Sequence, residues 1–88
     1  MYIIVQSCER ELSKPIVCKT LFDAQQKMYE LFIEAVGEEQ SEVIKQEIGD
    51  GLEEYEGYNC GIYLFSAWCN DAFGANHANW DAAIFERD

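Results

Sequence analysis

The chain has 88 residues, of which 49% are hydrophobic and 14% aromatic, and its 17 acidic and 6 basic residues give a net charge of −11. This length provides one domain, residues 1–88, with no second core, and the aromatic content excludes a disordered acidic tail. The negative charge repels nucleic acid and anionic lipid, so we expect neither direct nucleic-acid binding nor membrane binding, and we expect a basic partner.

The N-terminus and the cysteines indicate a cytoplasmic protein with free thiols. Met1–Val5 is apolar but has no basic flank and no small-residue cleavage site after it, unlike a secretory signal. No apolar stretch approaches the roughly 18 residues of a membrane span. Without a secretory signal, an even number of cysteines is better explained by reduced thiols than by disulfides. The cysteines are Cys8, Cys18, Cys60 and Cys69.

The first part of the chain predicts a β-hairpin. Residues 2–7 are mostly β-branched or apolar, which is typical of a strand. Residues 8–14 are polar and turn-like, and residues 15–19 predict a short second strand that Pro15 can open. We expect these two strands to pair.

A helix is predicted for residues 21–36. Thr20 can accept hydrogen bonds from the first turn, and Asp23 places a carboxylate near the positive end of the helix dipole. Gly37 is a typical C-terminal stop. Apolar residues recur at helical spacing and define one face: Leu21, Ala24, Met28, Leu31, Phe32, Ala35 and Val36, widened by Phe22, Tyr29 and Ile33.

Two alternatives stay open for residues 38–51. In the first, Ser41 caps a short helix over residues 42–48. The residues expected to face inward from it are Val43, Ile44 and Ile48. In the second, the first helix continues through a kink at Gly37. An acidic loop is expected to follow at residues 52–57.

Two further strands are predicted toward the C-terminus. Residues 58–68 alternate between two sets that are both largely apolar, which predicts a strand in the interior of a sheet. Residues 70–79 form an asparagine-rich loop, and residues 80–86 predict the last strand. We therefore expect an α+β fold: a small sheet of about four strands, antiparallel or mixed, in the order β-β-α-(α)-β-β, with one helical layer on one face.

Negative charge is concentrated in the middle of the chain. Residues 34–57 contain nine acids and one lysine, and hence −8 of the net −11. The acids are Glu34, Glu38, Glu39, Glu42, Glu47, Asp50, Glu53, Glu54 and Glu56. Closely spaced carboxylates can imitate the phosphates of a duplex, which carries one charge per about 1.7 Å of axis. One interpretation is a surface that occupies the basic groove of a nucleic-acid enzyme; the other is a solvated face that serves solubility.

No catalytic or metal-binding motif stands out, so we expect neither an enzyme nor a bound cofactor or metal. The cysteine spacings differ from the pairs, roughly two to four apart, of zinc sites. Residues 50–56 offer oxygen ligands but lack the spacing of a calcium loop. Cys69 and His77, with Asp71 or Asn76 to orient the imidazole, form one candidate nucleophilic set, in a chain with little room for a substrate cleft.

Two aromatic residues beside the asparagine-rich loop, Trp68 and Phe73, are expected to be partly exposed. A tryptophan near acidic residues is a suitable anchor for a protein–protein contact. Trp68 therefore joins the acids as a predicted partner-binding residue, whereas Trp80, which begins a strand, is expected in the core.

Two segments carry a resemblance, Ser66–Asn70 (SAWCN) and Asn79–Phe85 (NWDAAIF). Through them the chain resembles a loose group of small acidic proteins carried by phages and mobile elements of low-GC Gram-positive bacteria. Their genomic context implies, by association, antagonists of host defence such as anti-CRISPR or anti-restriction proteins. The resemblance supplies no catalytic residues.

The function expected is that of a non-enzymatic inhibitor. It would bind a basic surface of a nucleic-acid-processing host-defence enzyme through residues 34–56, by nucleic-acid mimicry. The alternative is a protein-interaction or structural module, homodimeric through an exposed sheet edge, whose acids serve solubility. A small hydrolase that uses Cys69 and His77 is the third hypothesis.

Overall fold

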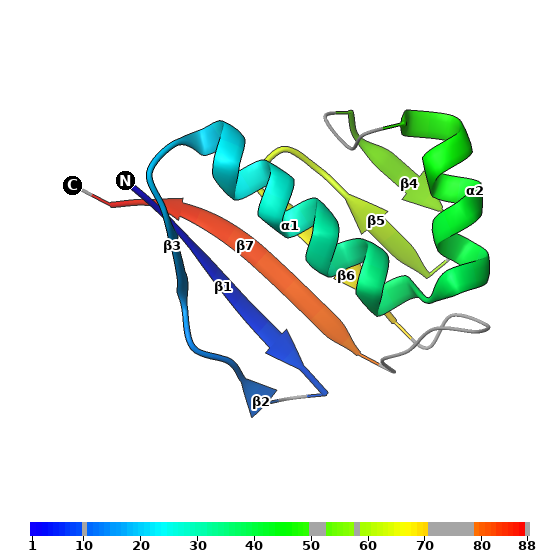
Figure 1. Ribbon diagram of the computed structural model, residues 1–88. Helices are drawn as coiled ribbons and strands as arrows, with labels where there is room; N and C mark the ends of the chain where they lie inside the picture. The colour runs from blue at the N-terminus through cyan, green and yellow to red at the C-terminus, as the bar shows by residue number, and fades with distance from the viewer. Residues whose placement is uncertain (10, 50–52, 58, 71–78, 88) are drawn as a thin grey trace.

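The computed structural model describes residues 1–9, 11–49, 53–57, 59–70 and 79–87, which form two helices and seven strands (Figure 1). The strands are β1 (Tyr2–Cys8), β2 (Glu11–Leu12), β3 (Ile16–Cys18), β4 (Tyr55–Gly57), β5 (Cys60–Ile62), β6 (Ser66–Cys69) and β7 (Trp80–Glu86). The helices are α1 (Leu21–Val36) and α2 (Glu38–Ile48), and both lie between β3 and β4 in the chain. The α+β class is confirmed.

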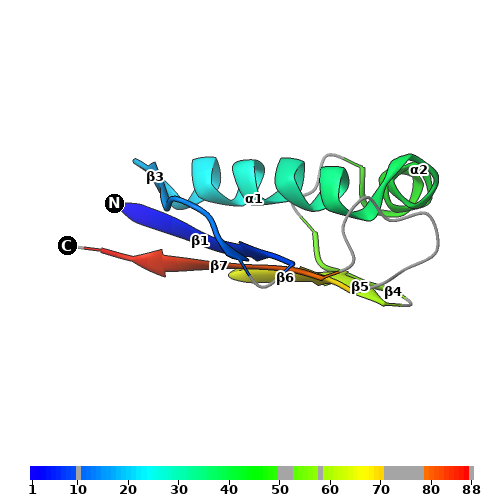
Figure 2. The same ribbon diagram turned by 90° about the horizontal axis from the view of Figure 1, so that it is seen from below.

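The described strands form one antiparallel sheet in the order β2-β1-β7-β6-β5-β4. Both β2 and β3 pair with β1 on the edge that β7 leaves open. Strands β1 and β7 pair along their full length, from Tyr2 opposite Glu86 to Cys8 opposite Trp80. Both helices lie on one face of this sheet, as Figure 2 shows, and the expected single helical layer is thus confirmed.

Helix α1 covers the predicted residues, and both of its predicted ends are confirmed. The Asp23 N–H donates to Thr20 Oγ1 at 3.0 Å, which satisfies one free donor of the first turn. After the last turn, Gly37 has a φ of 89°, a region in which residues with a Cβ are strained. Of the apolar face, Phe32 is fully buried, whereas Phe22 stays 56% exposed at the first turn.

Helix α2 is separate from α1 and longer than predicted. It begins at Glu38 rather than residue 42, because Gly37 breaks the helix and a new one starts at once; the continuous-helix alternative is wrong. Ser41 is no cap: it is buried inside α2, and its hydroxyl donates to the Glu38 carbonyl at 2.9 Å, as serine does inside helices. Ile44 is buried as predicted, but Val43 is exposed.

The sheet has more strands than the about four predicted, because the additional strands are too short to show a period of two. Strand β2 lies in the predicted turn, and β4 lies in the predicted acidic loop. The prediction of one strand over residues 58–68 is wrong. The chain reverses at Leu64 and Phe65, where the Tyr63 N–H donates to the Ser66 carbonyl at 2.7 Å. This turn has none of the glycine or asparagine that usually marks a tight hairpin.

The core lies between the helices and the inner face of the sheet. Its buried residues are Ile4, Ala24, Met28, Tyr29, Phe32, Ala35, Val36, Ile44, Cys60, Ile62, Ala67, Cys69, Trp80, Ala82 and Ile84. Phe32 of α1 and Trp80 of β7 meet with ring centroids 6.2 Å apart. The Trp80 indole N–H donates to Gln6 Oε1 at 2.9 Å, so its one polar atom is satisfied. The predicted core position of Trp80 is confirmed.

Candidate functional site

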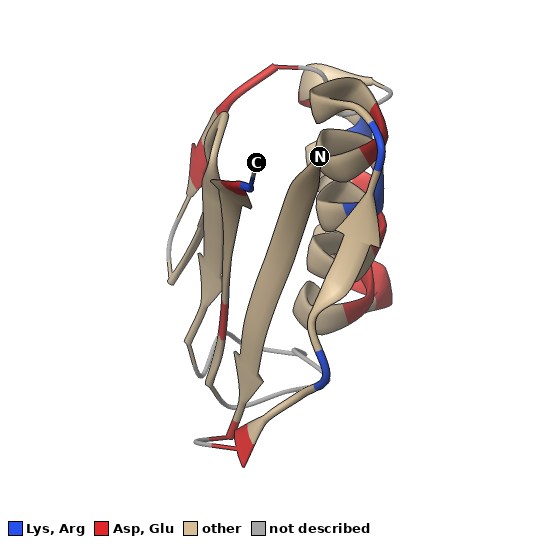
Figure 3. Cartoon of the chain, turned by 90° about the vertical axis from the view of Figure 1, so that its left-hand side faces the viewer, with Lys and Arg blue, Asp and Glu red and all other residues tan. Residues whose placement is uncertain are grey.

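The helical layer carries a large group of exposed acids. Over residues 21–48, all of which the structure describes, seven acids and two lysines are exposed. They are Asp23, Glu30, Glu34, Glu38, Glu39, Glu42 and Glu47, with Lys27 and Lys45. In Figure 3 the acidic positions of the helices, in red, lie mostly on the side that faces away from the sheet. The chain therefore presents one layer to solvent with a strong excess of negative charge.

Within this layer, the first half of α2 is the most acidic part. Glu38, Glu39 and Glu42 lie within an arc of about 100° around the helix axis. The first two stand in the first turn, where the positive end of the helix dipole favours carboxylates. On α1, Lys27 Nζ lies 3.8 Å from Glu30 Oε2, so the lysine offsets part of the negative charge of that helix. We refer below to Glu38, Glu39 and Glu42 as the α2 acidic group.

Glu34 occupies a different place, at the last turn of α1 beside the end of β1. With Cys8 and Trp80 it lines a hollow of about 220 Å³. Burial, followed by the nearby charges of Glu9, Glu11 and Glu34, raises the pKa of the Cys8 thiol. Cys8 therefore stays a protonated thiol in an acidic setting, which disfavours it as a nucleophile.

The remaining predicted acids are not all on the helical layer. Glu53 and Glu54 are exposed between α2 and β4. Glu56 is exposed in the middle of β4 and is paired with Gly61, whereas its neighbour Tyr55 packs against the core. Because successive strand residues point to opposite faces, Glu56 lies on the face of the sheet away from the helices. Asp50 lies outside the described residues.

The outer face of the sheet, away from the helices, is the second candidate surface. None of the described helices or strands covers it (Figure 2). The outward residues of β1 and β7 are Ile3, Val5, Ser7, Asp81, Ala83 and Phe85, in the positions that alternate with the buried ones. A sheet with one solvated face normally carries polar residues there. Four of these six are apolar instead.

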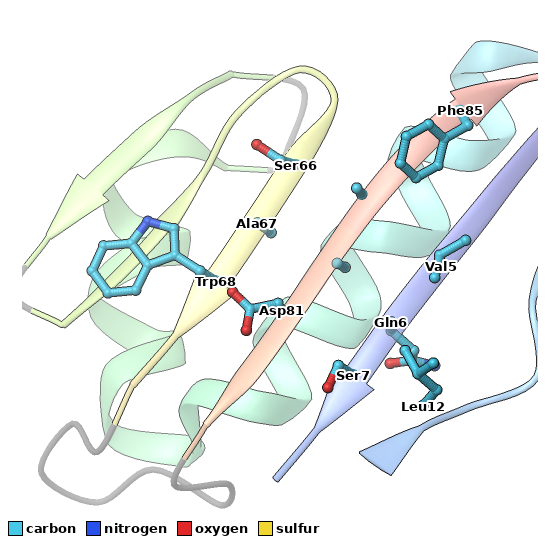
Figure 4. Close-up of a pocket in the computed structure, with 11 residues that line it drawn as sticks. Val5, Gln6, Ser7, Leu12, Ser66, Ala67, Trp68, Asp81 and Phe85 are labelled. Atoms are coloured by element: carbon cyan, nitrogen blue, oxygen red, sulfur yellow. The ribbon is translucent and has the colours of Figure 1, made fainter. Parts of the chain in front are cut away.

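A shallow groove of about 450 Å³ crosses the outer face over β1, β7 and β6 (Figure 4). Ser66, Ala83 and Val5 stand opposite one another in register and form a low floor. Larger side chains border it: Phe85 on one side, and Trp68 and Leu12 on the other. Phe85 is 56% exposed and Leu12 is 77% exposed, so the walls are open to solvent.

Trp68 belongs to this groove and not to the helical layer. It is half-buried on β6, opposite Asp81 of β7 on one side and Gly61 of β5 on the other. A Cβ added to Gly61 would lie 2.7 Å from Trp68 Nε1 and 2.9 Å from the Tyr63 hydroxyl oxygen, closer than such atoms approach. Gly61 thus lets the indole lie flat against the strand. The prediction that Trp68 is partly exposed is confirmed.

Cys69, the candidate nucleophile, is a core residue. It is fully buried on the inner face of β6, with its Sγ 3.9 Å from the Ala35 carbonyl oxygen. Burial, with a smaller contribution from neighbouring Cys60, raises the pKa of the Cys69 thiol to about 11. A thiol with this pKa is protonated at neutral pH and closed to solvent, which contradicts the exposed position expected for it. Asp71, Asn76 and His77, and also Phe73, lie outside the described residues.

Among the residues that the structure describes, no group of three or more His, Cys, Asp or Glu side chains is arranged to hold a metal ion. All four cysteines are free: Cys60 and Cys69 are buried, and Cys8 and Cys18 are half-buried. Neither α1 nor α2 is long and apolar enough to cross a membrane.

Comparison of the chain with family models, curated proteins and solved structures found no match. The resemblance to small acidic phage proteins therefore stays a prediction. The acidic helical layer and the outer face of the sheet are the two candidate binding surfaces of the molecule.

The groove contains residues that the sequence did not single out. The sequence predicts that Val5, Ala83 and Phe85 lie on strands but predicts no binding surface there. The sequence does contain a sign of this surface, because β1 and β7 carry apolar residues on both of their alternating faces. A chain can cover both faces of such a sheet only if it has a second layer of helices. Both described helices lie between β3 and β4 and form one layer, so the described elements leave one apolar face of the sheet open.

Proposed function

We propose that the protein is a non-enzymatic inhibitor or adaptor that binds a basic surface of a nucleic-acid-processing protein through its acidic helical layer. The placement of seven exposed acids against two lysines on α1 and α2 carries this proposal. Glu38 and Glu39, beside Glu42 one turn on, give a compact negative patch on a folded scaffold. Such a patch can occupy the place of nucleic-acid phosphates in a basic groove.

The proposal extends to the kind of target. A host-defence nuclease or a related enzyme has a basic groove for DNA or RNA, and an anti-CRISPR-like or anti-restriction-like protein would compete for it. The resemblance of Ser66–Asn70 and Asn79–Phe85 to small phage proteins supports this choice. Long-range attraction by a net charge of −11 would speed association, and salt would screen it.

The test begins with affinity capture from a bacterial lysate at low and high salt and identification of the captured proteins. A captured nucleic-acid enzyme is then purified and titrated in the presence of its DNA or RNA. We expect competition with the nucleic acid and weaker binding at higher salt. A captured protein that binds the chain and its nucleic acid together would contradict the proposal.

Two charge-reversal variants show which acids matter. The first is Glu38→Lys, Glu39→Lys and Glu42→Lys in the α2 acidic group. The second is Glu53→Lys, Glu54→Lys and Glu56→Lys, which changes net charge equally, from −11 to −5, but outside the helices. We expect the first to weaken binding about a hundredfold and the second much less. Equal losses would show that total charge, and not the helical layer, is responsible.

A second candidate function is a protein-interaction module that works through the sheet. The open apolar outer face favours it, because faces of this kind mark interaction sites. In this candidate the acids serve solubility, and the chain forms a homodimer through an exposed edge of the sheet. Sedimentation of the protein alone tests it: a tight dimer that ignores basic partners would favour this candidate over the inhibitor.

A further inference from the structure

We propose that the groove on the outer face of the sheet is a docking site for an amphipathic helix that carries lysine or arginine and belongs to the basic partner. The proposal rests on the proposed function only for the positive charge of the partner. The place and the form of the docking segment are derived from the groove itself.

The floor of the groove requires a partner that satisfies its own backbone. Strands β1, β7 and β6 lie under it, and each of them is paired on both edges within the sheet. Because strand hydrogen bonds run within the sheet toward these neighbours, the face of the floor does not present backbone donors or acceptors to an extended peptide. A segment that buries its backbone against this surface must form its hydrogen bonds internally, as a helix does. β-strand addition is confined to the outer strands β2, β3 and β4, away from the floor.

The relief of the groove suits the side chains of a helix. Ser66 and Ala83 are small and lie side by side on β6 and β7, between Phe85 and Trp68. On the other face of the same strands, Ala67 and Ala82 are small in the same way, and α1 packs there. A row of small residues between larger ones lets a helix approach a sheet closely and interlock with it. The outer face thus repeats the pattern that the inner face uses to hold α1.

Charge selects the kind of helix. Asp81 carries the one charge among the residues described as lining the groove, and it stands between Trp68 and Ser7 in register. A lysine or arginine at the edge of an apolar helical stripe would meet this carboxylate. A second copy of the chain would bring another −11 and an identical Asp81, so repulsion opposes a face-to-face homodimer.

The direct test uses a designed peptide of about 18 residues, about 27 Å long as a helix, built from leucine and lysine so that leucine forms one stripe. Its matched control has glutamate in place of every lysine. Trp68 reports binding at the groove by a change in fluorescence, whereas Trp80 is buried in the core on the other face of the sheet. A Trp68→Phe variant identifies the contribution of Trp68 to the signal.

Two substitutions locate the site. Ala83→Gln fills the floor of the groove with a neutral side chain. Val17→Gln is the matched control, because Val17 is also apolar, lies on the same outward face and is 56% exposed, but does not line the groove. We expect the lysine peptide to bind with a Trp68 signal, Ala83→Gln to weaken it about tenfold or more, and Val17→Gln to leave it unchanged. Asp81→Asn should weaken the lysine peptide, and the glutamate peptide should not bind. Circular dichroism checks that each variant is folded.

Several results would overturn the proposal. Peptide binding that Ala83→Gln does not affect would place the peptide elsewhere, including on the acidic helices. Equal binding of the glutamate peptide would show that the groove does not select a positively charged helix. A dimer of the protein alone that Ala83→Gln dissociates would make a second copy the occupant.

The outcome is separable from that of the proposed function. The α2 charge-reversal variant leaves the groove intact, so it should retain the Trp68 signal with the peptide while losing the captured enzyme. If the groove is not a docking site, Ala83→Gln will not change the affinity for the peptide. The effect of the α2 charge reversal on binding of the captured enzyme is still measured independently.

Discussion

Replacing Gly37 by alanine should destabilise the protein, because the break between α1 and α2 depends on a backbone conformation that alanine avoids. Gly37 has φ 89° and ψ 170°, a region almost restricted to glycine. Holding a residue with a Cβ there costs about 1–3 kcal/mol. Alanine also restricts the unfolded chain, which returns about 0.4–1 kcal/mol. We expect a net loss of about 1–2 kcal/mol in the free energy of unfolding.

A larger loss would have a definite cause. If alanine lets α1 run on through residue 37, α2 changes direction and Ile44 leaves the core, where it is fully buried. Removal of such a side chain costs about 2–5 kcal/mol. This packing loss would replace the backbone strain, because a helical residue 37 no longer has a positive φ. The loss would then be about 2–5 kcal/mol, a large part of the roughly 5–15 kcal/mol that stabilises a small domain.

Urea denaturation followed by circular dichroism measures the effect, with equal slopes required for the comparison. Gln46→Ala, at an exposed position in α2, is the control and should change stability by less than about 0.5 kcal/mol. If Gly37→Ala is as stable as this control, the positive φ is not required and the account of the helix break is wrong.

Three further predictions concern the helix cap, the core and a buried thiol. Thr20→Ala removes the bond from the Asp23 N–H and should cost about 1 kcal/mol in urea denaturation; no loss would mean that water satisfies this donor equally well. Phe32→Ala empties the space beside Trp80 and should lower the free energy of unfolding by about 3–5 kcal/mol. The variant should therefore unfold at low urea near room temperature, and a loss under about 1 kcal/mol would contradict the packing described. Between pH 9 and about 11 the native state keeps the Cys69 proton that the unfolded chain loses, so stability should fall as pH rises through this interval. Cys69→Ala should flatten the fall by about 2 kcal/mol, and an unchanged slope would show that other groups cause it.

Long elements with a clear period were predictable from the sequence. Residues 21–36 have apolar positions at helical spacing, and residues 80–86 have them at strand spacing. The ends of the helix also carry recognisable signals in Thr20 and Gly37. The apolar face of the helix could therefore be assigned from the sequence, with the exception of Phe22, which is 56% exposed. Trp80, Ala82 and Ile84 are buried as the alternation of the last strand requires.

Most short elements were not predictable, because three residues define no period; β3 is the exception, since its predicted pairing with β1 is confirmed. Strands β4 and β5 are held by their partners in the sheet rather than by their own sequence. Leu64 and Phe65 form a turn with residues typical of a strand, since the pairing on both sides imposes it. Here tertiary pairing overrides local preference.

The candidate site, too, was predictable from the sequence only in part. The excess of acid was evident in the sequence, and the helical part of it lies on one layer. The separation of Glu56 and Trp68 from that layer depends on strand register, which composition does not contain. The groove needed the order of strands as well, because Ser66, Ala83 and Val5 come from distant parts of the chain and meet in the sheet.

The pairing of β1 with β7 has a consequence for how the chain reaches this structure. Residues 2–8 and 80–86 are among the most distant in the sequence, yet they form the longest ladder of the sheet. The hairpin of β1 and β3 and the meander from β4 to β7 are local, but the core closes only when these two parts join across α1. Contacts of such long sequence separation slow folding. We therefore expect the search for the β1–β7 register to be the rate-limiting event, with either part alone unable to retain its native form.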